Sequence, residues 1–268
     1  MTEWRSVAYA TVPSETEAIA NGSPRMIEQH VIVTTKHGKM PAFTACPEGG
    51  GPFPPIILYM DAPGTREELR HHARRIARHG YFCILPDMYY RLGTVHFDIP
   101  RRDDAMSAVI RASMLSIDNA LVIDDTAATL GWLDGNDKVK PGGVGCVGHC
   151  MSGQYITTVS AKFPTRFVAS ASLYGVGIIT DKPDSPHLLL NDIKAELYYG
   201  FAETDASVPA HIPAALDDAL KKTDVKYTLK VFPGSAHGYT FAERPAYHPT
   251  AAEQTWADMF DLWDRHLK

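Results

Sequence analysis

The chain has 268 residues, a length that fits one large α/β domain. Hydrophobic residues make up 45% and charged residues 21% of it, the proportions of an ordinary soluble globular protein. The formal net charge of −5 provides no basic surface field, so we expect no nucleic-acid partner.

The chain begins with a segment that has no regular pattern. Residues 1–25 are polar and mixed, and we expect an irregular N-terminal extension followed by a single domain over residues 26–268. Apolar and polar residues then alternate from Glu28 to Thr35, and a second strand-like run extends from Met40 to Ala45. The glycine-containing turn between these runs makes a β-hairpin the predicted first element.

After the hairpin, apolar runs alternate with helical patterns. The apolar runs predict strands over residues 55–60, 81–85, 168–174, 194–199 and 225–231, and another strand in the apolar run that leads into the 148–153 stretch. The helical patterns cover residues 65–78, 102–115, 117–135, 154–162, 209–222 and 249–266. Thr65 is the predicted N-cap of the first helix, with Glu68 in the capping-box position. This order predicts an α/β fold with a mostly parallel sheet, helices on both faces and functional groups in loops after the strands.

One strand-to-helix junction carries a nucleophilic side chain. The sequence Gly148-His149-Cys150-Met151-Ser152-Gly153 follows an apolar run and opens a helical pattern. Gly148, Ser152 and Gly153 are small, as a tight strand–turn–helix requires. A helix N-terminus behind Cys150 would favour a thiolate and supply a backbone N–H group to a developing oxyanion. The stretch therefore predicts a nucleophile elbow that carries cysteine instead of serine.

Two later strand ends carry the groups that such a cysteine needs. Asp205 follows one predicted strand. His237 follows a second predicted strand, in a turn that contains glycines on both sides of it. The order nucleophile, acid, histidine is that of an α/β-hydrolase triad. Cys150 would attack an acyl carbonyl, His237 would take and return the proton, and Asp205 would orient the imidazole. Taken singly, Asp205 could be a helix cap and His237 a surface residue.

At these residues the chain resembles the dienelactone hydrolase family, a cysteine-nucleophile branch of the α/β-hydrolase fold. The most specific matches are the 148–153 segment, Asp205-Ala206-Ser207-Val208-Pro209 and Ala236-His237-Gly238; residues 85–91 and 174–177 also resemble family segments. The resemblance extends from the hairpin near Glu28 to the last helix. It implies a single-domain α/β-hydrolase fold.

The resemblance also implies groups around the nucleophile. The backbone N–H groups of Met151 and Ala62 would form the oxyanion hole. Asp61 takes the position of a family glutamate that helps to activate the thiol, although it could instead cap the helix that follows.

Substrate-binding residues follow from the same resemblance. Arg91 matches a family arginine that recognises a substrate carboxylate, a role suited to its bidentate donors; an ion-pair role is the alternative. A second family arginine is absent, because Phe241 stands near its position, and Arg244 could reach the pocket from another turn. Apart from the resemblance, four tyrosines are expected pocket walls, with core packing as an equal alternative: Tyr89, Tyr90, Tyr174 and Tyr239.

No metal or cofactor site is expected. The chain has no HExxH or CxxC motif and no glycine-rich phosphate loop. His71, His72 and His79 share a helical segment with several arginines, a pattern typical of a solvated face.

Cellular location is inferred from targeting signals and cysteines. No apolar run could span a bilayer, and no signal-peptide pattern follows the first five residues, so we expect no membrane partner. Cys46, Cys83 and Cys146 lie in or beside apolar runs and are predicted to be buried and inert. Four cysteines do not form a disulfide framework in a chain of this size, which favours a reducing, cytoplasmic location.

The sequence thus predicts a hydrolase of a small ester or lactone, of the dienelactone type, that acts through a thioacyl-enzyme. The alternatives are a broad carboxylesterase, an acyltransferase with another acceptor, and a hydrolase fold kept as a binding module. The complete set Cys150, Asp205 and His237 argues against the last. We expect a small-molecule substrate and a monomer or homodimer.

Overall fold

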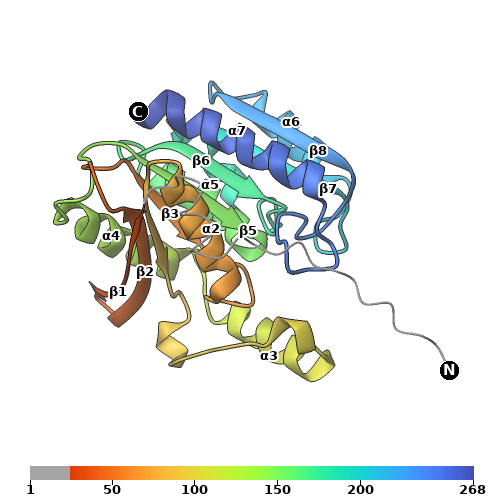
Figure 1. Ribbon diagram of the computed structural model, residues 1–268. Coiled ribbons are helices and arrows are strands. Elements are labelled where there is room, and N and C mark those ends of the chain that lie inside the picture. Colours follow the sequence, from red (N-terminus) through yellow and green to blue (C-terminus); the bar gives the residue numbers. More distant parts are fainter. Residues whose placement is uncertain (1–24) are drawn as a thin grey trace.

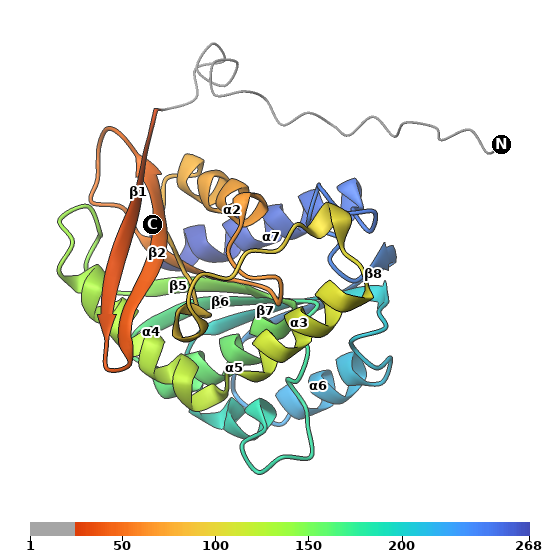
Figure 2. The same ribbon diagram turned by 90° about the horizontal axis from the view of Figure 1, so that it is seen from below.

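The structure, a computed structural model, describes residues 25–268 of the chain and consists of one twisted sheet between two layers of helices (Figure 1). The predicted N-terminal extension, residues 1–25, lies outside the described residues except for Arg25. The eight strands are ordered β1-β2-β4-β3-β5-β6-β7-β8. Helices α2 and α7 cover one face, and α4, α5 and α6 cover the other (Figure 2).

The strands and helices have the following bounds. The strands are β1 (Met26–Thr35), β2 (Gly38–Pro47), β3 (Pro55–Tyr59), β4 (Phe82–Pro86), β5 (Val144–His149), β6 (Phe167–Leu173), β7 (Glu196–Thr204) and β8 (Tyr227–Ala236). The α-helices are α2 (Glu67–Arg78), α3 (Asp104–Leu115), α4 (Asn119–Asp134), α5 (Gly153–Lys162), α6 (Ile212–Leu220) and α7 (Pro249–Leu267). Short 3₁₀ helices are η1 (Tyr90–Leu92), η2 (Ile99–Arg101), η3 (Cys150–Ser152) and η4 (Pro186–Asp192).

The sheet confirms the predicted α/β class with a mostly parallel arrangement. The predicted hairpin is β1 and β2, which pair antiparallel, and β2 pairs antiparallel with β4. All other neighbours, from β4 through β3 and β5 to β8, are parallel. Every residue of β3, β4 and β5 is buried, because helices cover both faces of these central strands.

Strands β7 and β8 are longer than predicted. Residues 200–202, expected to form a loop, pair with residues 230–232 of β8, and a register shift follows. Pro233 and Gly234 suggested a turn, yet both lie within β8. An edge strand tolerates proline because one side of it has no ladder to maintain, and β8 is the last strand of the sheet.

The start of α2 differs from the prediction. The helix begins at Glu67 with Arg66 as N-cap, and no side chain caps it, so Thr65 is not the cap. Glu68 does not complete a capping box; its carboxylate accepts hydrogen bonds from Arg66 Nε and Nη2 at 2.9 and 2.5 Å. A charge-assisted bond to a guanidinium is stronger than a bond to a backbone N–H group, which explains the preference.

The histidine-rich face of α2 is solvated only in part. His72 is 7% exposed and stacks on Phe241 with 4.9 Å between ring centroids, so the expectation of a solvated face is wrong for this residue. It lies three residues after Leu69 and four before Ile76, both fully buried, which places it on the core face of the helix.

Within residues 25–268, no single helix is both long and apolar enough to cross a membrane. Only α3 and α4 taken together reach the required length and composition, and they are bent by 73° at their junction.

Candidate active site

The ends of three parallel strands bring the predicted functional residues to one edge of the sheet. Cys150 follows β5 directly, and Asp205 and His237 follow β7 and β8. Thr204 of β7 pairs with Ala236 of β8. Asp205 and His237 come directly after these two residues, so they lie at the same height along the sheet. This agrees with the rule that ligand sites of parallel sheets lie beyond the carboxyl ends of the strands.

Cys150 has the strained backbone of a nucleophile elbow. Its φ angle is 53°, in the left-handed region that non-glycine residues rarely adopt. The turn is tight enough to exclude side chains on both sides. A Cβ atom on Gly148 would lie 2.7 Å from Ser152 O, and one on Gly153 would lie 2.1 Å from Gly175 Cα. The small residues are therefore required by contact, as the sequence predicted.

Asp205 combines the two roles that the sequence left open. Its Oδ1 atom accepts hydrogen bonds from the backbone N–H groups of Ser207 and Val208 at 2.8 and 3.1 Å. Its Oδ2 atom lies 2.7 Å from Nδ1 of His237, and its side chain is only 4% exposed. One oxygen thus fixes the local turn while the other orients the imidazole.

His237 lies between Asp205 and Cys150. Burial disfavours its charged form, but hydrogen bonds with Asp205 and Cys150 outweigh burial and raise the pKa of His237 to about 9. Because Nδ1 is engaged with Asp205, the other ring nitrogen is the one available to the cysteine. The edge of Tyr174 packs against the imidazole, with ring centroids 5.0 Å apart.

Asp61 is the centre of a buried ion cluster. Its carboxylate is fully buried, and Arg66 Nη1 and Arg244 Nη2 each donate to it at 2.5 Å. Arg66 also binds Glu68, so two guanidinium groups and two carboxylates lie together. Burial alone would raise the pKa of Asp61, but the two arginines hold it well below its usual range. Asp61 is therefore a permanent anion between two cations.

The segment that follows β3 is connected to the elbow by two side chains. The Ser152 hydroxyl donates to the Met60 carbonyl, the last residue before Asp61. The Tyr89 hydroxyl donates to the Ala62 carbonyl at 2.7 Å and lies 3.5 Å from Met151 Sδ. These contacts hold Ala62 and Met151, whose N–H groups are the predicted oxyanion donors, in a fixed relation.

The other predicted substrate-binding residues have partners inside the protein. Arg91 donates two hydrogen bonds to Asp125, at 2.9 and 2.7 Å, which corresponds to the ion-pair alternative. The hydroxyl of Tyr174 pairs with Thr240 at 2.6 Å, and that of Tyr239 pairs with Thr255 at 2.9 Å. Both tyrosines are fully buried, in agreement with core packing. The structure does not bring Arg91 into a contact with Cys150, Asp205 or His237.

The histidine next to the cysteine points into the core. His149 is fully buried, and its ring lies 5.2 Å from that of His72 and 5.1 Å from that of Phe241. Burial lowers the pKa of His149 to about 4. The residue is neutral at pH 7 and packs as an aromatic group.

Comparison with known proteins identifies the chain. The model of the family described as "Dienelactone hydrolase family" matches residues 40–267. The chain belongs to the dienelactone hydrolase family. It is therefore a hydrolase, and the resemblance read from its motifs is confirmed.

Relatives and solved structures agree with this family. A Synechocystis protein named "Putative carboxymethylenebutenolidase" is 28% identical and covers 89% of this chain and 96% of its own length. A protein of the same name from Methylorubrum extorquens is 26% identical, covering 97% of this chain and 88% of its own length. A Klebsiella pneumoniae crystal structure described as "Putative Dienelactone Hydrolase" has a TM-score of 0.81 at 23% identity and covers 90% of this chain and all of its own.

In this dienelactone hydrolase family member, sequence reasoning missed part of the site. Arg66 was not singled out, and Glu68 was assigned only to helix capping, although both contact the Asp61 cluster. An arginine five residues after a buried aspartate was the available signal. Arg244 was considered, and its guanidinium lies over the Phe241 ring at 4.0 Å. In the part of the chain that the structure describes, no group of three or more His, Cys, Asp or Glu residues could hold a metal ion.

Proposed function

We propose that this hydrolase cleaves a small ester or lactone through a triad of Cys150, His237 and Asp205. The observation that carries the proposal is the 2.7 Å contact between Asp205 Oδ2 and His237 Nδ1, at the same edge of the sheet as Cys150, whose φ angle is 53° and which is among the groups that raise the pKa of His237. A nucleophile, a base in contact with it and a group that orients the base are the features of covalent acyl transfer.

The proposed reaction has two halves. The thiol proton of Cys150 passes to His237, whose raised pKa favours the imidazolium, and Sγ then attacks the acyl carbonyl as the thiolate. The backbone N–H groups of Met151 and Ala62 stabilise the oxyanion. When the carbonyl re-forms, the C–O bond breaks, and the alkoxide leaves with the proton from His237. The resulting thioester is attacked by water, which gives its proton to His237, and the C–S bond then breaks to release the acid and restore the thiol.

Asp61 has a supporting role in this proposal. Both of its carboxylate oxygens accept hydrogen bonds from arginine, so its proton affinity is low and His237 is the better base for the thiol. The predicted help of Asp61 in thiol activation stays a prediction. We assign to Asp61 the fixing of the loop that presents the Ala62 N–H group.

The substrate class is proposed from the relatives. Two of them are named as carboxymethylenebutenolidases, which supports a dienelactone-type lactone as the first candidate; a broader range of esters is the alternative. An assay of cis- and trans-dienelactone against p-nitrophenyl esters distinguishes these possibilities. A competing amine or thiol in the same assay would reveal acyl transfer to an acceptor other than water. A cytoplasmic location and a monomer or homodimer also stay proposals.

The decisive experiment is the replacement of the nucleophile. Cys150→Ala should abolish p-nitrophenyl acetate turnover, while the control Cys46→Ala, at a cysteine that is 2% exposed, should retain it. Iodoacetamide should label Cys150 first, because the other three cysteines are buried. Unchanged turnover in Cys150→Ala would refute the assignment.

A further inference from the structure

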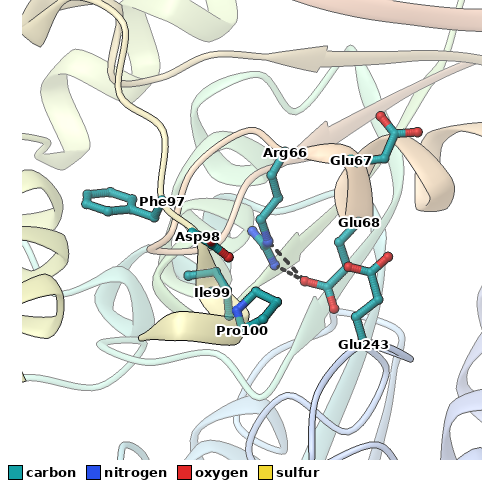
Figure 3. Close-up of a pocket in the computed structure, with 8 residues that line it drawn as sticks. All are labelled: Arg66, Glu67, Glu68, Phe97, Asp98, Ile99, Pro100 and Glu243. Atoms are coloured by element: carbon teal, nitrogen blue, oxygen red, sulfur yellow. Dashed lines mark hydrogen bonds and ion pairs between the residues drawn. The ribbon is translucent and has the colours of Figure 1, made fainter. Parts of the chain in front are cut away.

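A cavity of about 150 Å³ lies beside the Asp61 cluster, between the start of α2 and the segment that leads into η2 (Figure 3). The reaction proposed above uses none of its surface. It shares Arg66 with the cluster. It is lined by Arg66, Glu67, Glu68, Phe97, Asp98, Ile99, Pro100 and Glu243.

The charges around this cavity leave an excess of carboxylate. Arg66 and Arg244 together balance Asp61 and Glu68, because each guanidinium lies beside both carboxylates. Glu243 has His71 as its ion-pair neighbour, at 3.5 Å, and the charge of Glu68 acts on it. Asp98 is paired with Arg101, and Glu67 with Arg70 and Arg74, so Glu243 is the lining carboxylate that has no arginine partner among the described residues.

One buried carboxylate oxygen in this cavity has no partner. Glu68 is 4% exposed, and its Oε2 atom accepts from Arg66, whereas Oε1 has no hydrogen-bond partner among the residues described. Figure 3 shows the Glu68 and Glu243 carboxylates near each other, across the cavity from Phe97 and Ile99. A buried acceptor without a donor is unfavourable, so a ligand that placed an N–H donor there would remove this penalty. Burial and the charge of Glu68 also raise the pKa of Glu243.

We propose that this cavity binds a small organic cation, a primary ammonium group on a short alkyl stem. An ammonium group has three N–H donors and no acceptor, which suits Glu68 Oε1 and the Glu243 carboxylate. Phe97, Ile99 and Pro100 offer apolar surface to the stem. A metal ion is disfavoured, since the described residues provide no group of three potential metal ligands. The proposal does not depend on the assigned triad.

Calorimetric titration of the full-length protein with n-butylammonium at pH 7.5 tests the site, with n-butanol as the uncharged match. We expect saturable binding of the amine and none of the alcohol. Glu68→Gln and Glu243→Gln should each weaken binding about tenfold, because each loses a charge-assisted hydrogen bond. The matched control is Glu67→Gln, whose carboxylate is bonded to Arg70 and Arg74 instead; it should change affinity less than about twofold.

Three results would overturn the proposal: no saturable binding of n-butylammonium, equal binding of n-butanol, or unchanged affinity in both Glu68→Gln and Glu243→Gln. If thermal unfolding shows that Glu68→Gln does not fold, Glu243→Gln decides, because that side chain is 47% exposed. Binding is measured without turnover, so a failure of the hydrolase assignment would leave this result intact.

A second measurement identifies the source of the ammonium group. If n-butylammonium raises the KM of p-nitrophenyl acetate without changing kcat, the cavity belongs to the substrate site and the cation is carried by the substrate. If both constants are unchanged while calorimetry shows binding, the ligand is a separate small amine. Both of these results presuppose that the cavity binds the amine. If calorimetry detects no binding, both explanations are refuted.

Discussion

Single residues in this site act through more than one atom. Asp205 caps a turn with Oδ1 and holds His237 with Oδ2, so its position is fixed before any substrate arrives. Tyr89 and Ser152 connect the elbow to the segment after β3 through their hydroxyl groups. Such contacts fix the positions of the candidate site's residues through neighbouring side chains.

The protonation of His237 depends on its two neighbours. Burial disfavours the imidazolium, and Asp205 and Cys150 overcome that penalty, giving a pKa of about 9. Cys150→Ala removes one of the two partners, so the pKa of His237 should fall by about 1–3 pH units. Titration of the His237 ring by NMR measures this. Cys46→Ala is the control and should leave the titration unchanged; equal values in wild type and Cys150→Ala would contradict the contact.

At the scale of elements, the start of α5 lies close against the backbone of the segment that follows β6. Gly153 starts α5 and packs against Gly175, the second residue after β6. Only residues without a Cβ atom permit this contact, and it sets the position of the helix whose N-terminus lies behind Cys150. The backbone geometry at Cys150, the proposed nucleophile, therefore depends on the packing of an entire helix.

Substitution at this close contact should destabilise the fold. In Gly153→Ala the new Cβ would lie 2.1 Å from Gly175 Cα, and overpacking of this kind costs about 1–3 kcal/mol or more. Gly131→Ala is the matched control, because Gly131 lies within α4 with open space around its Cα. It should stabilise by about 0.5–1 kcal/mol, since alanine favours a helix. Urea unfolding compares the two, and equal effects would contradict the argument.

At the scale of the whole molecule, the Asp61 cluster joins distant parts of the chain. Asp61 follows β3, Arg66 precedes α2, and Arg244 lies between β8 and α7, 183 positions from Asp61. The cluster couples the end of the sheet to the helices that cover it. Removing one member of a buried ion group leaves the others without a counter-charge, which is strongly unfavourable.

Asp61→Asn should therefore lower the free energy of unfolding by about 3–5 kcal/mol at pH 7. The folded-state pKa of Asp61 lies below its ordinary value of 3.8, so its stabilisation is present above pH 3.8 and is lost as pH falls through the folded-state value. The difference in the free energy of unfolding between wild type and Asp61→Asn should be the same at pH 7 and pH 5. It should become smaller below pH 3.8.

The control for this variant is an exposed ion pair. Asp134→Asn breaks the pair with Arg166, in which the aspartate side chain is 54% exposed, and should cost at most about 1 kcal/mol. Urea unfolding across the pH range supplies the comparison. If Asp61→Asn loses no more free energy of unfolding than Asp134→Asn does, the cluster does not stabilise the fold.

Much of this molecule was determined by the sequence alone. The alternation of apolar runs and helical patterns predicted the α/β class, and the small residues around Cys150 predicted the tight turn in which that residue has a positive φ angle. These features depend on local geometry and periodicity, which neighbouring residues specify. The motifs at Cys150, Asp205 and His237 also sufficed to recognise the family.

The tertiary structure alone decided the partners of the charged and aromatic residues. Arg91 binds Asp125, and Asp61 binds Arg66 and Arg244. His72 lies in an aromatic core and not on a solvated face. No spacing rule specifies these contacts. The folded sheet and helices bring several acceptors from distant positions within reach of each long side chain, and only the tertiary structure determines which acceptor is bound. The local order of residues determined the tight turn at Cys150. Long-range packing determined which charged residues pair with one another around it.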